Sequence, residues 1–230
     1  MHLRIKYGKT REGKFLSHLD LMRAWERAFR RGAIPLAFSQ GFNPHPKISF
    51  GSALAVGVTS SGEYMDVELK KFREIKEIKA TLENYLPLGL KIYDIVEIDP
   101  ATPSLMSKIN RAKYQVQGKL IEDFSATQGE EIAHQLLAEE NIIVQSYSKK
   151  GFKDKNIRPG IFALSIEVDE INKSVLVEFI VQTGSQGNIR PEEVMQALHG
   201  LGLPVSIDLM DFHREGLYID EAGHLFSPLS

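Results

Sequence analysis

Residues 17–35 carry the strongest pattern in the chain and read Ser-His-Leu-Asp-Leu-Met-Arg-Ala-Trp-Glu-Arg-Ala-Phe-Arg-Arg-Gly-Ala-Ile-Pro. Ser17 followed by Asp20 is a capping-box pattern, in which side chains satisfy the free backbone N–H groups at the start of a helix. Gly32 and Pro35 are typical of a helix end. We therefore predict a helix over about 17–31, whose core-facing residues would be Leu19, Met22, Ala28 and Phe29.

The same helix carries four arginines at a spacing that places them on one face, namely Arg23, Arg27, Arg30 and Arg31. Arginine suits phosphate because its planar guanidinium donates two parallel hydrogen bonds. The alternative is a solvated helix face that is stabilised by a Glu26–Arg30 pair. Four arginines with only one interleaved acid favour phosphate binding slightly.

Strands and helices alternate on both sides of this helix. In the first hundred residues we predict strands at Leu3–Tyr7, Ile34–Phe38, Glu63–Leu69 and Leu90–Ile98, and a second helix at Arg73–Tyr85. Together with the first helix, this order is the βαββαβ arrangement of ferredoxin-like folds.

Residues 101–110 have the composition of a linker, and the order then repeats. In this part we predict strands at Arg111–Ile121, Ile142–Tyr147, Ile161–Val168, Ser174–Val181 and Val205–Phe212, with helices at Gly129–Glu140 and Pro191–Leu198. The extra strand makes this a degenerate repeat. The predicted fold class is thus α+β, with two tandem ferredoxin-like units. The predicted division is a basic N-terminal domain at 1–100, a C-terminal domain at 111–215 and a tail at 216–230.

The connection after the first helix is unusually long, with 24 residues from Ser39 to Gly62 between two predicted strands. Loops of this length inside compact domains are usually functional or disordered. This one offers polar groups and phenylalanines (Phe38, Phe42, Phe50), a mixture that single-stranded RNA sites use. We expect the contact surface to be formed by Phe42, Asn43, His45 and Lys47. The alternative is an Ω-like loop packed by its own phenylalanines.

Histidines raise two further hypotheses. His18, Asp20 and His45 are too few and too scattered to indicate a metal site, and helix capping explains Asp20, so no metal is expected. His45 and Lys47 form the candidate catalytic pair of a metal-independent endoribonuclease, with His45 as general base and Lys47 stabilising charge. This catalytic hypothesis is the weakest of those that we consider.

A second candidate anion site lies at Gly187, Asn188 and Arg190, where a glycine-rich stretch precedes a predicted helix that begins at Pro191. Glu192 and Glu193 lie in the first turn of that helix and would repel an external anion. A structural turn is therefore favoured at this point. No phosphate-binding loop, nucleophile elbow or zinc-protease motif occurs in the chain.

The 230 residues contain no cysteine, which excludes disulfides, thiolate zinc sites, cysteine nucleophiles and cysteine-ligated iron–sulfur clusters. No apolar run approaches the roughly 20 residues that span a bilayer. The N-terminus lacks the apolar stretch of a secretory signal. We expect a cytoplasmic protein that makes no membrane contact and has no cofactor of its own.

Charge is distributed unevenly along the chain. Residues 1–60 hold ten Lys or Arg against three Asp or Glu, whereas the other 170 residues hold 18 basic and 27 acidic side chains. The electrostatic field that this uneven charge produces would direct an anionic partner toward the N-terminal region.

Three stretches, at residues 15–22, 27–35 and 38–50, resemble the radical SAM-linked proteins, a bacterial family also known as DUF2344. Residues 187–193 are similar to the C-terminal motif of that family. The resemblance implies association with cobalamin-binding radical SAM proteins, which such domains are fused to or encoded beside, often near genes for an E/G-type RNase and ribosomal proteins. The absence of cysteine fits a partner of such an enzyme, since the radical SAM cluster needs three cysteines.

The leading hypothesis is a non-catalytic RNA-associated module that works with a radical SAM enzyme in RNA or ribosome maturation. A protein-interaction subunit that docks on that enzyme through residues 39–62 is the first alternative. The endoribonuclease that uses His45 is the second.

Overall fold

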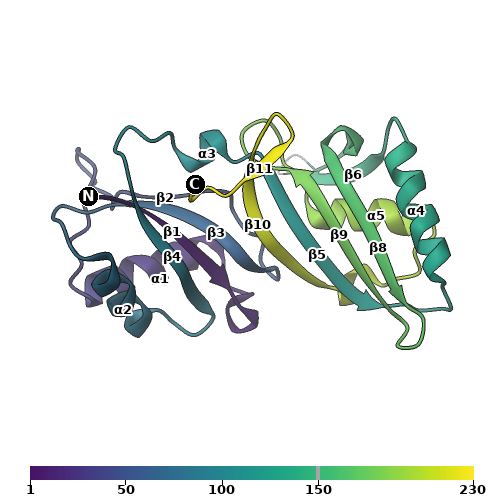
Figure 1. The fold of residues 1–230 in the computed structure, drawn as a ribbon, viewed down its shortest axis with the longest axis horizontal. Helices are drawn as coiled ribbons and strands as arrows, with labels where there is room; N and C mark the ends of the chain where they lie inside the picture. The colour runs from purple at the N-terminus through teal and green to yellow at the C-terminus, as the bar shows by residue number, and fades with distance from the viewer. Residues whose placement is uncertain (149–150) are drawn as a thin grey trace. The chain divides into compact units, whose positions relative to one another are not determined.

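The computed structural model describes residues 1–148 and 151–230, and it confirms the α+β class predicted from the sequence (Figure 1). The chain forms two compact units. The first consists of residues 1–110 and 216–230, and the second of residues 111–215. Residues 216–230, for which the sequence suggested a separate tail, thus belong with the N-terminal residues.

The sheet of the first unit has the strand order β4-β1-β3, and the short β2 also pairs with β3. Its elements are β1 (His2–Lys9), η1 (Arg11–Gly13), α1 (His18–Arg31), β2 (Ile48–Phe50), β3 (Thr59–Glu68), α2 (Ile75–Tyr85), β4 (Leu90–Ile98), α3 (Leu105–Lys108) and β11 (His224–Phe226). β1 pairs antiparallel with β3 and with β4, and β2 pairs antiparallel with β3. Ile5 on β1 lies opposite Met65 on β3 and Ile95 on β4.

Apolar side chains occupy every second position along β1 and therefore point to one face of the sheet, the face that α1 and α2 cover. Leu3, Ile5 and Tyr7 are buried in a core that they share with Trp25 and Phe29 of α1. The rings of Tyr7 and Trp25 meet edge to face with their centroids 5.3 Å apart. Burial of large side chains of this kind contributes roughly 1.5–3 kcal/mol each, so this layer fixes the orientation of α1.

The opposite face of the sheet carries a buried ion pair. The guanidinium of Arg4 donates two hydrogen bonds to the carboxylate of Asp66, at 2.7 and 2.9 Å. Nη1 of the same side chain donates to the carbonyl oxygen of Pro228 at 2.8 Å, and Nη2 reaches the carbonyl oxygen of Pro103 at 3.5 Å. Residues near the C-terminus therefore complete the first unit by bonding to its first strand.

The second unit contains the strand order β10-β5-β9-β8 and a separate two-stranded sheet formed by β6 and β7. Its elements are β5 (Arg111–Lys119), α4 (Ala126–Ala138), β6 (Ile143–Ser148), β7 (Gly151–Asn156), η2 (Arg158–Gly160), β8 (Ile161–Asp169), β9 (Ser174–Gln182), α5 (Pro191–Gly200), η3 (Ile207–Leu209) and β10 (Asp211–Glu221). The boundary between the units falls within β10, after Glu215.

Two strand predictions need correction, and a third correction concerns a strand that was not predicted. Ile34–Phe38 forms no strand, since Leu36 and Phe38 make only isolated bridges and β2 lies at Ile48–Phe50 instead. Pro35 and Pro46 lack the N–H that a continuous ladder requires. The last strand was predicted at Val205–Phe212 but runs from Asp211 to Glu221, because Leu203 and Val205 are buried in a connection rather than in a strand.

The third correction concerns β7, for which no strand was predicted. Its sequence, Gly-Phe-Lys-Asp-Lys-Asn, lacks the apolar alternation of a strand that covers a core.

In the described part of the chain, no helix is long and apolar enough to cross a membrane.

Candidate nucleic-acid interface

Helix α1 has the two-faced character that its sequence predicts, although its buried face is turned relative to the prediction. The buried residues are Leu21, Ala24, Trp25, Ala28 and Phe29. Leu19, predicted to face the core, is 52% exposed, because the core is centred on Trp25. The N-cap is as predicted, since the hydroxyl oxygen of Ser17 accepts a hydrogen bond from the backbone N–H of Asp20 at 3.1 Å. All four arginines are exposed.

These arginines have no bonded partners among the residues that the structure describes. Among residues 1–148 and 151–230, none of the four guanidinium groups forms an ion pair or a hydrogen bond, and the expected Glu26–Arg30 pair is not formed. Arg30 and Arg31 lie in the last turn of α1, where positive charge stabilises the helix dipole. Arg23 and Arg27 lie in the middle of the helix and gain little from that effect. Their positive charge therefore has no structural explanation.

Three basic residues that the sequence reasoning missed lie at the C-terminal end of α1. Lys70 donates its backbone N–H to the carbonyl oxygen of Pro35 at 2.8 Å, and Nη2 of Arg73 donates to the carbonyl oxygen of Ala33 at 3.2 Å. Lys71 is exposed. The basic run Lys70-Lys71-Phe72-Arg73 was the signal that could have identified them. We call this set the basic face, and it consists of Arg23, Arg27, Arg30, Arg31, Lys70, Lys71 and Arg73.

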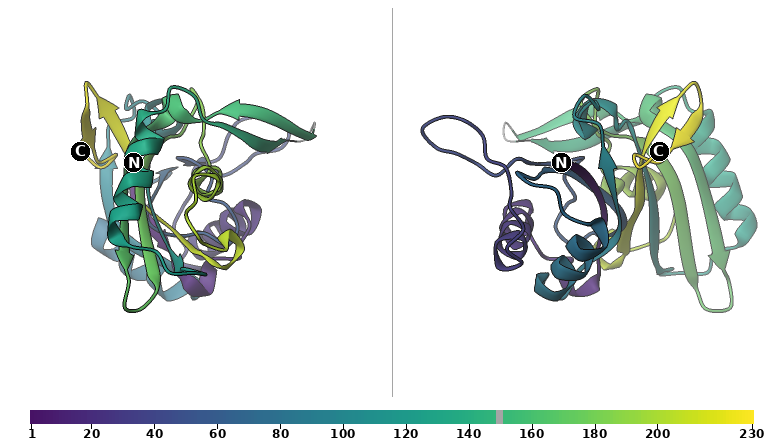
Figure 2. Two further views of the ribbon diagram at one scale, coloured as in Figure 1. Left: turned by 90° about the vertical axis from the view of Figure 1, so that its right-hand side faces the viewer. Right: turned by 60° about the vertical axis from the view of Figure 1, so that its left-hand side comes forward.

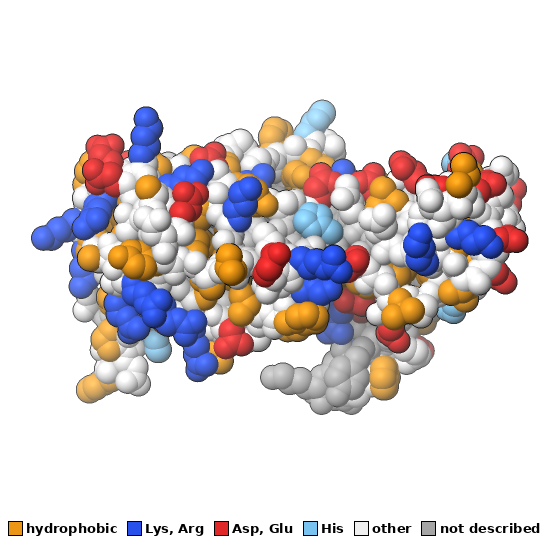
Figure 3. All heavy atoms as spheres, turned by 90° about the horizontal axis from the view of Figure 1, so that it is seen from below, with side chains coloured by type: hydrophobic (Ala, Val, Ile, Leu, Met, Phe, Trp, Pro, Cys, Tyr) orange, Lys and Arg blue, Asp and Glu red, His pale blue; other side chains and the backbone are white. Residues whose placement is uncertain are grey.

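Figure 3 shows Lys and Arg side chains gathered on the left-hand part of the molecule, over the first unit. This is the unit in which the sequence concentrates its positive charge. The gathering therefore agrees with the charge asymmetry along the chain.

The segment from Phe38 to Pro46 forms a closed loop that projects on the side of α1 (Figure 2, right). Phe38 and Pro46 form an isolated bridge at its base. The backbone N–H of Ser39 donates to the carbonyl oxygen of His45 at 2.8 Å, and the N–H of His45 donates to the hydroxyl oxygen of Ser39 at 3.0 Å. Gly41 has φ +125°, a conformation that suits glycine. The base of the loop is therefore bonded, and its tip is presented to solvent.

The three phenylalanines of this connection have different environments. Phe42, at the loop tip, is fully exposed. Phe38 is partly exposed and lies beneath the amino group of Lys70, which is 5.4 Å from the ring centroid. Phe50 contacts the rings of Tyr7 and His18, with centroids 6.3 and 5.3 Å apart. Only Phe50 packs inward, so the loop is not held together by its own phenylalanines.

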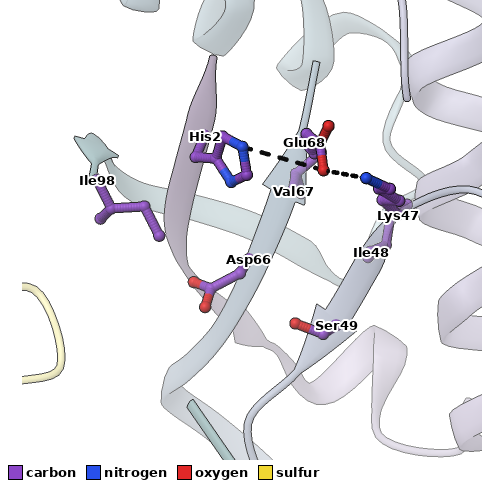
Figure 4. A pocket seen from close by; sticks show the side chains of 8 residues that line it. All are labelled: His2, Lys47, Ile48, Ser49, Asp66, Val67, Glu68 and Ile98. Atoms are coloured by element: carbon purple, nitrogen blue, oxygen red, sulfur yellow. Dashed lines mark hydrogen bonds and ion pairs between the residues drawn. The ribbon is translucent and has the colours of Figure 1, made fainter. Parts of the chain in front are cut away.

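Lys47 lines a pocket of about 210 Å³ on the sheet of the first unit, where its Nζ lies 2.7 Å from Oε2 of Glu68 (Figure 4). Nε2 of His2 lies 4.0 Å from the same oxygen. The hydrogen bond from Lys47 lowers the pKa of Glu68 below its usual value, against a smaller opposing effect of burial. Because Lys47 is paired with Glu68 and His45 is exposed at the loop, the arrangement lends no support to a His45–Lys47 catalytic pair.

Of the other sequence candidates, His18 and Asp20 have structural roles, whereas Asn43 does not. His18 packs against Phe50, and Asp20 accepts a hydrogen bond from the hydroxyl of Ser17 at 2.7 Å. Within the described ranges, no three His, Asp or Glu side chains are grouped closely enough to hold a metal ion. Asn43 is exposed on the loop beside Phe42.

The stretch from Gly187 to Arg190 is occupied by the protein's own carboxylate. Oε2 of Glu193 accepts a hydrogen bond from the backbone N–H of Arg190 at 3.0 Å, which is the position that an external anion would take. The side chain of Asn188 accepts a bond from Thr183 at 2.9 Å. We therefore interpret Gly187, Asn188 and Arg190 as a structural turn and leave them out of the candidate interface.

Fold and site together define an α+β protein with an uncompensated basic helix face and an exposed aromatic loop. The chain belongs to the family described as "Uncharacterized protein conserved in bacteria (DUF2344)", whose model matches residues 2–191. A comparison with curated protein sequences found no match.

Among solved structures, the chain is similar to one chain in the crystal structure of a Cbf5-Nop10-Gar1 complex, with 14% sequence identity and a TM-score of 0.50. The match covers 92% of this chain and 47% of that chain, so this chain spans about half the length of its structural neighbour. At this identity the likeness concerns the fold alone.

Proposed function

We propose that the protein is a non-catalytic RNA-associated module and that the basic face and the loop at Phe38–Pro46 contact RNA. The observation that carries this proposal is the absence of internal partners for Arg23 and Arg27 within the described residues. Guanidinium groups without a bonded partner among the described residues are suited to an external anion, and arginine binds phosphate through two parallel hydrogen bonds.

The loop adds a second kind of contact. Phe42 exposes an entire aromatic ring beside Asn43 and His45, and an exposed ring provides a stacking surface for an unpaired base. The hydrogen bonds between Ser39 and His45 hold the base of the loop, which reduces the entropy lost when a ligand binds its tip. Single-stranded or looped RNA fits this arrangement better than a regular duplex.

The radical SAM partner rests on the family resemblance. In this proposal the module presents RNA to a radical SAM enzyme during RNA or ribosome maturation.

The strand orders support a further proposal, that the two units are variants of the ferredoxin-like arrangement. In a ferredoxin-like sheet, the fourth, first, third and second strands are neighbours in that order. The first unit has this order as β4-β1-β3 with β2 paired to β3, and the second unit has it as β10-β5-β9-β8. In the second unit, β6 and β7 would then be an insertion.

The test is a filter-binding titration of the full chain against total cellular RNA at low and moderate salt. Arg23→Glu/Arg27→Glu is compared with wild type and with Lys91→Glu/Lys119→Glu, which makes the same charge change at exposed positions outside the basic face. We expect salt-sensitive binding by wild type and the control, and a loss of at least tenfold in the arginine variant. Because each phosphate contact on a single strand contributes about 0.7 to the slope of log K against log salt, the slope should fall by about 1.4.

A wild-type affinity that does not depend on salt, or equal losses in the two double variants, would contradict the proposal. The first outcome would exclude phosphate contacts as the main source of affinity. The second would indicate that only net charge matters.

A protein-docking subunit is the second candidate, and the exposed apolar side chains of the long connection favour it. Phe42 is fully exposed and Val56 is 56% exposed. If this surface docks on a protein, Phe42→Ala should abolish co-purification with the radical SAM partner, whereas Arg23→Glu should leave it nearly intact.

A further inference from the structure

Strand β6 of the second unit has an edge that no other strand covers. It pairs with β7 in the register Val144↔Lys155 and Ser146↔Lys153, and among the described residues it pairs with no further strand. Figure 2 (left) shows the described residues of this hairpin projecting from the rest of the second unit. A free strand edge presents unpaired backbone N–H and C=O groups, which can pair with another chain.

The register identifies which backbone groups of β6 are free. The N–H of Ile157 donates to the carbonyl oxygen of Ile142 at 2.9 Å, so these two residues form a hydrogen-bonded pair at the base of the hairpin. Hydrogen-bonded and non-bonded pairs alternate along an antiparallel ladder. Ile143 and Gln145 therefore direct their N–H and C=O groups away from β7, and these groups bond to no other described residue.

The same edge borders a groove of about 390 Å³ within the second unit. One side of the groove is formed by residues 141–145, and the other by Gln196, Ala197, Gly200 and Leu201 on one face of α5 and its end. Ile143 is 58% exposed there. A Cβ added at Gly200 would meet no atom within 4 Å, so the groove is open at this point. A free strand edge opposite a helix, with apolar side chains between them, suits an extended peptide that adds a strand.

The carboxylate of Glu193 holds β6 beside α5. It is buried and accepts hydrogen bonds from the hydroxyl of Ser146 on β6 at 2.7 Å and from Nζ of Lys155 on β7 at 2.6 Å. Nζ of Lys155 also donates to the carbonyl oxygen of Asn188 at 2.7 Å. We call these bonds the Glu193 network. Because the network joins both strands to α5, the groove is formed before a ligand arrives, which lowers the entropy lost on binding.

Charge at one end of the groove selects the ligand further. Glu139 lines the groove and Glu140 follows it, and neither carboxylate forms an ion pair or a hydrogen bond with a described residue. Both lie at the C-terminal end of α4, where the helix dipole is negative, and the last turn of α4 has no basic residue. The described lining of the groove contains no Lys or Arg. This end therefore favours a cation and disfavours an RNA backbone.

We propose that the groove binds an extended, basic peptide segment of a partner protein, which adds antiparallel to β6. Alternate apolar side chains of the peptide lie between β6 and α5. An antiparallel peptide places its C-terminal end beside the start of β6, so its Lys or Arg residues lie there and meet Glu139 and Glu140. The inference concerns the second unit alone and does not depend on RNA binding. A second copy of this chain, paired edge to edge through β6, is the alternative occupant.

The experiment measures fluorescence anisotropy of a labelled heptapeptide with the full chain. The peptide alternates valine with threonine, ends in two lysines, and is acetylated and amidated. Two further peptides carry backbone N-methyl groups, one on the valines and the other on the threonines. Because only one alternate set of N–H groups in a strand faces its neighbour, we expect one methylated peptide to lose at least tenfold in affinity and the other to bind like the parent.

Two variants of the chain block the groove in different ways. Gln145→Pro removes an N–H that faces the groove and that β7 does not use, a position at which an edge strand tolerates proline. Gln145→Ala is its matched control, because it also removes the side chain, which bonds to Asp154, but keeps the N–H. Gly200→Leu fills the groove with a better helix former. We expect the Kd to rise at least tenfold in Gln145→Pro and Gly200→Leu, and less than twofold in Gln145→Ala.

Glu139→Lys/Glu140→Lys tests the charge. This variant should prefer a heptapeptide that ends in two glutamates, whereas wild type should prefer the lysine peptide. The same preference in both proteins would contradict the assigned cationic end.

No binding of the parent heptapeptide by wild type, or equal losses with both methylated peptides, would overturn the proposal. Analytical ultracentrifugation distinguishes the alternative occupant, since a wild-type dimer that Gln145→Pro abolishes, without peptide binding, would assign the edge to a second copy. Urea denaturation of each variant checks that the fold is retained. RNA binding by Gln145→Pro should equal that of wild type, so failure of this proposal leaves the proposed function standing.

Discussion

The basic face of α1 and the Glu193 network in the second unit both contain charged side chains, but only one of them is satisfied internally. Glu193 is 4% exposed and bonds to Lys155, Ser146 and the backbone of Arg190. Arg23 and Arg27 are exposed and make no bond to any described residue. The comparison teaches that a charged side chain stabilises the fold where the chain itself supplies its bonding partners. Where the chain supplies none, the charged side chain is available to bind a ligand.

The largest expected effect follows from removing the buried carboxylate. In Glu193→Ala, Ser146 and Lys155 lose their shared carboxylate acceptor, and Lys155 keeps a largely buried charge with only the carbonyl oxygen of Asn188 as a partner. We expect the free energy of unfolding to fall by about 2–4 kcal/mol, measured by urea denaturation. A loss below about 0.5 kcal/mol would show that the network does not stabilise the unit, and the contrast with α1 would disappear.

An intermediate effect is expected from pH. Burial raises the pKa of Glu193, but the hydrogen bonds from Lys155, Arg190 and Ser146 outweigh it and hold that pKa below its usual value. A lowered folded-state pKa contributes stability above the unfolded-state pKa of about 4.3, and this contribution is lost as pH falls through the folded-state pKa.

Wild type should therefore lose more stability than Glu193→Gln between about pH 5 and pH 2, as measured by urea denaturation at each pH. The variant starts from a lower stability, and the two curves should converge on acidification. Parallel curves would argue against the lowered pKa.

The smallest effect is expected at the basic face. Arg23→Ala/Arg27→Ala removes two exposed side chains without described partners, so the free energy of unfolding should change by no more than about 0.5 kcal/mol. Thermal denaturation of the variant beside wild type measures it. A loss above about 1.5 kcal/mol would mean that these arginines stabilise the protein and would weaken the argument for a ligand.

Local patterns in the sequence were sufficient for the fold class and for α1. Ser17 caps that helix as predicted, and the arginine spacing correctly indicated one exposed face. The choice of Leu19 as a core residue was wrong. The position of the sheet decides which side of the helix is buried, and helical periodicity does not encode that position. Strand β6 was predicted, at Ile142–Tyr147, but its partner β7 was missed, because the sequence of β7 has no apolar alternation.

The candidate interface was predicted in part. Residues on one helix or one loop, such as Arg23 and Phe42, were accessible to sequence reasoning because their neighbours are local. Lys70 and Arg73 bond to Pro35 and Ala33 across more than thirty residues, so their membership depends on tertiary structure. The role of Glu193 at the start of α5 was foreseen only as repulsion of an anion, whereas the structure shows it bonded to both strands of the hairpin.

The bond between Arg4 and Pro228 has a consequence for the order of events during synthesis. The two residues are 224 positions apart, so at about 5–20 residues per second the ribosome makes Pro228 roughly 10–45 s after Arg4. Once β3 and β4 have been made, the outer face of β1, with the Arg4–Asp66 pair, still lacks its bond to Pro228 until the end of this interval. The first unit is therefore completed only after residues 111–215 of the second unit have been made, and a nascent chain held at residue 215 should expose this face to a chaperone or a protease.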